Sequence, residues 1–342
     1  MQKFREIEIA GNAYDRGVMH GEQLRGEISD SLDFYRDIFM LPAQSVLEQA
    51  AYFQNIIGDF DADYAEEISG IAAGSGQDVL WIVALNARTE ILALKQIASV
   101  NECTSMCFQD QSILGQTWDW GKPLEAICAV MRISRPDGHV IRMLTEPGII
   151  GKIGMNNAGL GVCLNILTLG SRLDGVPVHV MLRAILDCQS AEQAAAVINR
   201  AATGKSSNII VADRSGNCFD KEFAGEETYD PAPVNGVIVH TNHYLGKQIN
   251  APDDPLFFNS HARFKTATER AAQTINPTVA GMMDILSDRS HGEFPIQRAY
   301  VADDVLQSVG TVATIVMDLT AQEFHIRKGN EADTEFTTFA VT

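Results

Sequence analysis

The amino-terminal part of the chain spaces its apolar residues as amphipathic helices do. Between residues 13 and 94 the period is helical, with Leu32, Tyr35 and Ile38 on one face. Because such a stripe buries one side of a helix, this region is predicted to be helical. The glycine-rich stretch 70–76 predicts a break before a further helix. A second stripe with the same period lies at Val46, Ala50, Phe53 and Ile57.

Beyond Cys103 the period of the pattern changes to two, which is typical of strands. The turn Arg135-Pro136-Asp137-Gly138 separates two such runs, because proline presets one turn dihedral and glycine tolerates positive φ. The sequence therefore predicts hairpins and single strands at 130–134, 139–144, 149–155, 160–164, 208–213, 217–223, 237–241, 311–318 and 323–327.

Helical spacing returns between these strands. Ser190 and Gln193 form a capping box ahead of one helix. Runs of helices therefore alternate with runs of strands three times along the chain. This order is expected when helical layers cover two stacked antiparallel sheets, so we predict an α+β fold. Parallel α/β folds rank behind it because they alternate more finely. No linker marks a boundary, so residues 1–342 are predicted to form one domain. The predicted later helices are 177–187, 194–202, 260–272 and 278–286.

The charge balance bears on the partners of the protein. The chain has 26 basic and 44 acidic residues, a net charge of −18, and no basic stripe that could follow a phosphate backbone. Nucleic acid is therefore not an expected partner. With 46% apolar residues the chain can bury a sizeable core, yet no run reaches the about 18 apolar residues that cross a bilayer. We expect no membrane association.

The start of the chain and its cysteines bear on the cellular compartment. Residues 1–10 are polar and charged rather than a secretory apolar segment. The cysteines form no CxxC pair, and the chain is too long to need a disulfide framework. A reducing, cytoplasmic location is therefore predicted. The six cysteines are Cys103, Cys107, Cys128, Cys163, Cys188 and Cys218.

Cys103 lies where the helical pattern gives way to strands, in the run Asn101-Glu102-Cys103-Thr104-Ser105. A thiol at such a junction can attack the carbonyl of the preceding residue, and hydrolysis then leaves an amino-terminal cysteine. Its free α-amine, with a reference pKa of about 7.7 to 8, can serve as the base for the same thiol. The alternative is that Cys103 is a buried core thiol, since free cysteine is among the most buried residue types.

Four motifs in order resemble one enzyme family. The run Ile113-Leu114-Gly115-Gln116-Thr117-Trp118-Asp119-Trp120 follows Cys103 as the second strand of a hairpin. A Cys-Thr-Ser start followed by such a strand is similar to the penicillin acyltransferase family of autoproteolytic amino-terminal-nucleophile hydrolases, with Thr117 departing from its pattern. Residues 11–21, 151–160 and 240–243 resemble the family's opening helix, second hairpin and oxyanion segment. The resemblance spans nearly the whole chain.

This resemblance implies a fold, a cleavage site and an activity. The implied fold is the four-layer αββα sandwich of the amino-terminal-nucleophile hydrolases. The implied cut lies between Glu102 and Cys103, so that segment 1–102 and segment 103–342 form two associated chains. Glu102 departs from the glycine found at this site in the fungal penicillin enzyme. The implied activity is amide hydrolysis or acyl transfer on linear, non-peptide amides through a Cys103 thioester, with a small-molecule amide or acyl donor as partner.

The same resemblance assigns roles to further residues. Asn242 ends the predicted strand 237–241 and matches an oxyanion donor; its alternative is a turn asparagine that bonds its own backbone. Asp119 matches the aspartate that supports self-cleavage and would orient the new α-amine. Ser105 lies on the strand face of Cys103 and could bond that amine, or be a routine strand serine. Arg298 matches a late arginine of the family and could equally be a surface arginine.

Two rival functions and several other chemistries remain to be weighed. A thiol hydrolase that never cleaves itself could use His243 or His291 as base, and a non-enzymatic binding protein could keep the fold. His240 and His243 lack a third ligand at metal-site spacing, so no metal is predicted. The sequence predicts no cofactor either.

Overall fold

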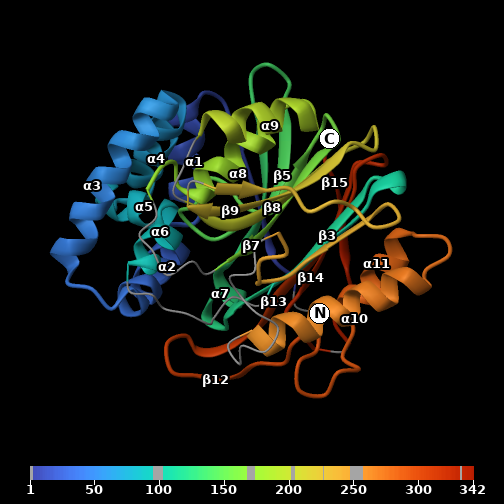
Figure 1. Ribbon diagram of the computed structural model, residues 1–342. Helices are drawn as coiled ribbons and strands as arrows, with labels where there is room; N and C mark the ends of the chain where they lie inside the picture. The colour runs from blue at the N-terminus through green and yellow to red at the C-terminus, as the bar shows by residue number, and fades with distance from the viewer. Residues whose placement is uncertain are drawn as a thin grey trace.

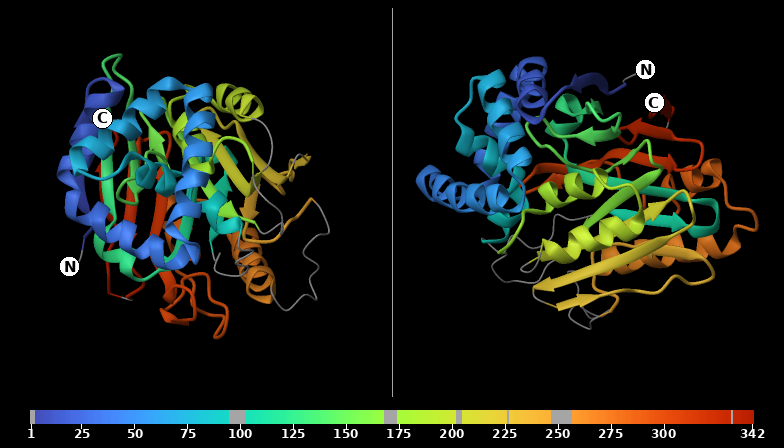
Figure 2. Two further views of the ribbon diagram at one scale, coloured as in Figure 1. Left: turned by 90° about the vertical axis from the view of Figure 1, so that its left-hand side faces the viewer. Right: turned by 90° about the horizontal axis from the view of Figure 1, so that it is seen from above.

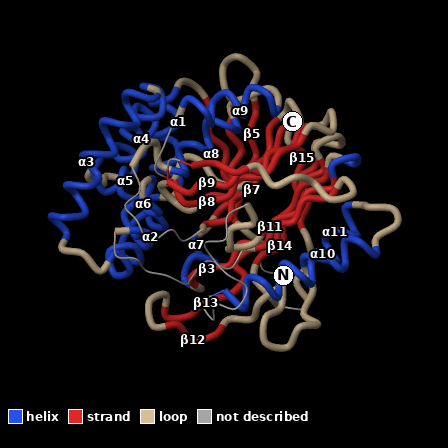
Figure 3. The backbone as a smooth tube through the Cα atoms, in the orientation of Figure 1, coloured by secondary structure: helices blue, strands red, loops and turns tan. Residues whose placement is uncertain are grey.

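Two β-sheets stack face to face at the centre of the molecule, with helices on the outer face of each (Figure 1 and Figure 3). The computed structural model describes residues 3–94, 103–167, 174–201, 205–225, 227–246, 257–331 and 333–342. Within these residues the predicted α+β fold of two sheets covered by helices is confirmed.

The first sheet has eight strands in the spatial order β1-β4-β5-β6-β7-β8-β9-β10. Neighbouring strands are antiparallel, except that β1 runs parallel to β4. The strands are β1 (Arg5–Ala10), β4 (Ala129–Ser134), β5 (Val140–Thr145), β6 (Gly154–Asn156), β7 (Leu160–Ile166), β8 (Lys205–Asp213), β9 (Cys218–Gly225) and β10 (Glu227–Tyr229).

The second sheet has seven strands in the order β11-β2-β3-β13-β14-β15, with β12 paired to β13. All of its pairs are antiparallel. Strands β2 and β3 of this sheet pack against β7 and β8 of the first one. The strands are β2 (Thr104–Phe108), β3 (Ile113–Gly121), β11 (Val237–His240), β12 (Val301–Asp303), β13 (Gln307–Asp318), β14 (Glu323–Lys328) and β15 (Thr337–Ala340).

Helices cover both sheets and gather at one end of the molecule (Figure 2). The first sheet is covered by α8 (Val178–Leu186) and α9 (Ala191–Arg200), and the second by α10 (Phe258–Gln273) and α11 (Val279–Leu286). A short helix, α7 (Pro123–Ile127), follows β3. The amino-terminal helices are α1 (Ala13–Gln23), α2 (Arg25–Phe39), α3 (Ala43–Phe60), α4 (Ala62–Ser75), α5 (Val79–Asn86) and α6 (Arg88–Ala93).

The two predicted helical stripes are confirmed. Every stripe residue on α2 and α3 is at most 3% exposed. The break predicted over 70–76 occurs only at Gly76, whose φ of 73° ends α4. Gly70 and Gly74 instead lie inside α4 because they face α1. A Cβ on Gly70 would lie 2.2 Å from the Tyr14 carbonyl oxygen, so only glycine permits this close packing.

The structure differs from the sequence analysis in strands β1, β6 and β10 of the first sheet, and the short edge strand β10 was not predicted. Strand β1 was not predicted, although Ile7 and Ile9 alternate with exposed glutamates and are buried. The strand predicted over 149–155 is reduced to β6. The Asn86 side chain binds the Gly148 carbonyl and the Ile150 N–H, so this segment has partners other than a neighbouring strand. Within the described residues, the helices are all too short or too polar to cross a membrane.

Candidate active site

Cys103 directly precedes β2, between the two sheets, and is 6% exposed. Three side chains from distant parts of the chain hold its backbone. Its N–H donates to Asn242 Oδ1 at 2.8 Å. Its carbonyl accepts from Arg263 at 2.6 Å and from Asn165 Nδ2 at 3.1 Å. The residue that the sequence predicts as nucleophile is therefore fixed on both sides of its Cα atom.

Asn242 follows β11 and contacts Cys103 through its side-chain oxygen, Oδ1. This oxygen accepts from the Cys103 N–H and from Arg263 at 2.9 Å, and two donors fix the orientation of the amide. Its Nδ2 donates one hydrogen to the Ile166 carbonyl at 3.0 Å. The backbone N–H donates to Ser260 Oγ at 2.7 Å. Asn242 thus holds the nitrogen of Cys103 and keeps a second Nδ2 hydrogen for another acceptor.

Arg263, on α10, is a contact that the sequence analysis missed, as is Asn165 on β7. Arg263 is 1% exposed, and its hydrogen bonds go to four neutral oxygens, on Cys103, Thr104, Asn242 and Asn259. Burial lowers its pKa, and the Asp119 and Cys103 charges oppose that effect. A signal existed in the sequence, because Arg263 falls in the inward helical stripe with Ala267 and Ala271.

Asp119 on β3 is completely buried next to the nucleophile. Burial raises its pKa to about 7, while Arg263 and the Thr311 hydroxyl act in the opposite direction. Its two carboxylate oxygens form no well-aligned hydrogen bond with the described residues. The backbone N–H of Asp119 is close enough to the Cys103 sulfur to lower the pKa of that thiol, whereas the Asp119 carboxylate raises it. A carboxylate with a pKa near 7 is suited to accept a proton at neutral pH.

The Cys103 thiol is protonated in this environment. Burial and the nearby Asp119 raise its pKa to about 11, and Arg263 and Lys152 lower it only in part. A thiolate is the reactive form, so attack requires a group that takes the proton. Asp119 is the buried carboxylate adjacent to this thiol.

The structure gives less direct information on the other predicted site residues, Ser105, Arg298 and Glu102. The Ser105 hydroxyl is buried, and the described residues offer it no hydrogen-bond partner; the contacts of Cys103 come from Asn242, Arg263 and Asn165 instead. The Arg298 backbone N–H donates to Thr311 Oγ1 at 2.9 Å, and Thr311 is paired with Asp119. Glu102 lies outside the described residues.

The histidines of the rival mechanism are poorly suited as bases. His243 bonds Ser260 Oγ at 2.8 Å, and its ring lies against the ring of His261 with 3.7 Å between the centroids and a tilt of 37°. Burial and the adjacent His261 lower its pKa to about 2. His291 is exposed, and its Nδ1 accepts from the Phe294 N–H. No group of three His, Cys, Asp or Glu side chains in the described part of the chain is arranged to hold a metal ion.

A second buried carboxylate, also missed from the sequence, fixes the segment that carries Asn242. Glu222 Oε1 accepts from His240 Nε2 at 2.8 Å and from the Leu245 N–H. Glu222 Oε2 accepts from the Gly246 N–H at 2.9 Å. The segment 240–246 is therefore held on both sides of Asn242.

The chain matches a known family over most of its length. The family described as "Acyl-coenzyme A:6-aminopenicillanic acid acyl-transferase" matches residues 107–333. The chain belongs to this family. Its relatives include the acyl-coenzyme A:6-aminopenicillanic-acid-acyltransferase 40 kDa form of Emericella nidulans, 29% identical over 96% of this chain and 94% of that protein. Protein dcd1A of Dictyostelium discoideum is 26% identical over 62% of this chain and 54% of its own length.

A solved structure agrees on the fold. A variant of conjugated bile acid hydrolase from Clostridium perfringens is 14% identical, covers 70% of this chain and 92% of its own, and has a TM-score of 0.50. The resemblance drawn from the four motifs is thus confirmed, with the amino-terminal-nucleophile hydrolase fold. Membership of an acyl-transferring family likewise confirms an enzyme of the amide hydrolase or N-acyltransferase class.

Proposed function

We propose that this enzyme cleaves itself between Glu102 and Cys103 and then acts on linear amides through a Cys103 thioester. The observation that supports the proposal most is the placement of one residue. The Cys103 nitrogen is held by Asn242 while its sulfur lies beside Asp119, whose pKa is about 7. Both atoms needed for an acyl shift are thereby oriented before the cut.

Self-cleavage begins with transfer of the thiol proton to Asp119. The sulfur then forms a bond to the Glu102 carbonyl carbon, and the bond from that carbon to the Cys103 nitrogen breaks. Asp119 returns the proton to the departing nitrogen, which becomes the α-amine. Water hydrolyses the thioester, leaving a carboxylate on Glu102 and a free thiol on Cys103. Arg263 and Lys152 favour the thiolate electrostatically during this sequence.

In the mature enzyme the α-amine takes the place of the amide nitrogen. Asn242 Oδ1 keeps its hydrogen bond to that nitrogen, and the amine becomes the base for the thiol. The thiolate attacks the acyl carbon of the substrate, and the second Nδ2 hydrogen of Asn242 donates to the oxyanion. The amine product leaves, and water or an acceptor amine resolves the thioester. Exclusion of water decides between hydrolysis and acyl transfer.

The substrate class follows from the relatives. A penicillin acyltransferase similar over most of this chain favours a small-molecule acyl donor or amide. The segments 1–102 and 103–342 are proposed to stay associated after cleavage. Their shared core supports this, because Tyr35 and Arg88 of the first segment bind the buried Glu146 of the second. The cytoplasmic location stays a prediction.

The proposal is tested by Cys103→Ser with Cys188→Ser as the matched control. Both thiols are 6% exposed, and Cys188 lies in the turn between α8 and α9. A hydroxyl is a far weaker nucleophile near neutral pH. Cys103→Ser should cleave slowly or remain whole and lose amide turnover, whereas Cys188→Ser should retain both. Wild-type turnover in Cys103→Ser would remove Cys103 from the role of nucleophile.

A further inference from the structure

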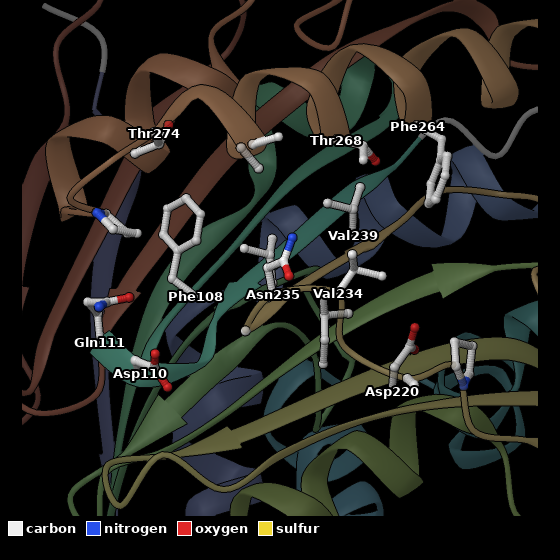
Figure 4. Close-up of a pocket in the computed structure, with 18 of the residues that line it drawn as sticks. Phe108, Asp110, Gln111, Asp220, Val234, Asn235, Val239, Phe264, Thr268 and Thr274 are labelled. Carbon is white, nitrogen blue, oxygen red and sulfur yellow. The ribbon is translucent and has the colours of Figure 1, made fainter.

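A pocket of about 410 Å³ opens beside the edge strand β11, between α10 and the segment 231–236 (Figure 4). It extends along β11 to the far end of β2, where Phe108 pairs with Val237; Cys103 precedes the opposite end of β2. Its volume is in the range of small-molecule sites. Apolar side chains form most of its wall, among them Phe108, Val234, Val239, Leu245, Phe264 and Ala271.

Asp220 supplies a polar group at one side of this pocket. It lies on β9 and is 1% exposed. Its Oδ1 accepts from the Asn208 amide. Its Oδ2 is buried and has no hydrogen-bond partner in the described part of the chain. Figure 4 shows the carboxylate pointing from the side of β9 toward Val234 and the pocket. A buried carboxylate oxygen without a donor is costly, so a ligand that brings a donor would be stabilised.

The charges around Asp220 favour a cationic donor. Glu222 Oε1 takes the one nearby imidazole, His240 Nε2, at 2.8 Å. Two buried carboxylates thus share one histidine, and a negative charge remains even when that histidine is protonated. Burial raises the pKa of Asp220 to about 6, so it is mostly ionised at neutral pH. The described residues that line the pocket include Asp110 and no lysine, arginine or histidine.

We propose that this pocket binds a primary alkylamine in its ammonium form. The ammonium group donates to Asp220 Oδ2, and the alkyl chain lies along the apolar wall between α10 and β11. A neutral alcohol of the same length lacks the charge, and a carboxylate is repelled by Asp220 and Asp110. The site does not include Cys103, so the proposal does not depend on the chemistry proposed there.

Calorimetric titration of the wild-type enzyme, without any acyl donor, tests the ligand class. Hexylamine, hexan-1-ol and hexanoate share one chain length and differ in charge. Hexylamine should bind at least about tenfold more tightly than hexan-1-ol, because its ammonium forms a charge-assisted hydrogen bond that the alcohol lacks, and hexanoate should bind most weakly. Equal affinity for the amine and the alcohol would contradict the proposal.

Two variants locate the site. Asp220→Asn should weaken hexylamine binding about tenfold or more, and it should fold because the new amide can donate to Asn208 Oδ1, which is buried without a partner among the described residues. The control Asp137→Asn removes an exposed carboxylate paired with Arg135 and should leave binding unchanged. Unchanged binding in Asp220→Asn would overturn the proposal.

Thr268→Trp keeps the carboxylate and fills the space instead. Thr268 is exposed on α10 and lines the pocket, so the indole can occupy the groove without entering the core. Hexylamine binding should be lost in this variant, with the melting temperature unchanged. If Asp220→Asn proved unstable, this variant would decide: retained hexylamine binding would show that the amine binds elsewhere.

Discussion

Asp119 and Glu146 are both completely buried, yet their surroundings act on their charges in opposite directions. Glu146 accepts from Arg88 at 2.7 Å, from Lys152 at 2.5 Å and from the Tyr35 hydroxyl. Burial alone would raise its pKa, but Arg88 and Lys152 hold that pKa well below its usual range. Asp119 has no such ion pair among the described residues, and burial raises its pKa to about 7.

The difference separates a structural carboxylate from a reactive one. A carboxylate with every oxygen paired stays ionised and keeps its neighbours in place. A carboxylate with a raised pKa can exchange a proton near neutral pH, which is what removal of the Cys103 proton requires. Replacing Asp119 by asparagine should therefore affect proton transfer, whereas replacing Glu146 by glutamine should affect stability.

The largest effect is expected for Asp119→Asn on self-cleavage. Loss of a positioned general base typically lowers a rate by about 10² to 10⁴. Precursor made by cell-free synthesis, followed by gel electrophoresis, should convert to two fragments that much more slowly than wild type. An Asp119→Asn chain that cleaves at the wild-type rate would show that another group accepts the thiol proton.

The pH dependence of stability and of self-cleavage gives a second test of the role of Asp119. The folded-state pKa of Asp119, about 7, is above the value of about 3.9 that an aspartate has in an unfolded chain, so the folded chain binds this proton more tightly than the unfolded chain. The stability that this group contributes is therefore present at low pH and is lost as pH rises through about 7. In the uncleaved Cys103→Ala chain, Asp119→Asn should remove that loss. The self-cleavage rate of wild-type precursor should rise over the same pH interval, as the base ionises.

Glu146→Gln should instead affect stability. The amide would leave Arg88 and Lys152 buried without a counter-charge, which typically costs about 3 to 5 kcal/mol of unfolding free energy. Urea unfolding of the uncleaved Cys103→Ala chain measures this cost. The control Glu27→Gln removes a partly exposed pair with Arg5 and should cost at most about 1 kcal/mol. Equal losses in the two variants would mean that the Glu146 cluster is not a structural element.

Asn242→Ala should lower turnover by about 10² to 10³, the usual effect of removing an oxyanion donor. It also removes the acceptor for the Cys103 nitrogen, so cleavage should slow as well. Turnover is compared per cleaved molecule, with the exposed turn residue Asn217→Ala as the control. Full activity in cleaved Asn242→Ala would require a different oxyanion donor.

Much of the fold could be predicted from the sequence, because local patterns determine it. The stripes on α2 and α3 are long and regular, and both are buried as expected. That Gly70 and Gly74 continue helix α4 instead of ending it could not be predicted in the same way. A glycine inside a helix and a glycine that ends one look alike until the facing helix is known, and here α1 decides.

Residues of the candidate site could be predicted only where they lie in a recognisable sequence motif. Cys103, Asp119 and Asn242 lie in motifs and do converge, Cys103 and Asp119 from the hairpin β2–β3 and Asn242 from the segment after β11. Arg263 and Glu222 lie in no motif, and their importance comes from contacts made across the fold. A buried charge can be suspected from its place in an apolar stripe, but its partner depends on packing that sequence spacing does not encode.

The central claim is that Cys103 cuts the chain before it acts on substrate. An intact-mass spectrum of freshly purified, active protein tests this claim most directly. Cleavage after Glu102 should give fragments of about 11 and 26 kDa, in proportion to 102 and 240 residues of a 37.3 kDa chain, which remain associated in the native state because each would expose a large apolar face alone. A single full-length mass in a fully active preparation would contradict the account.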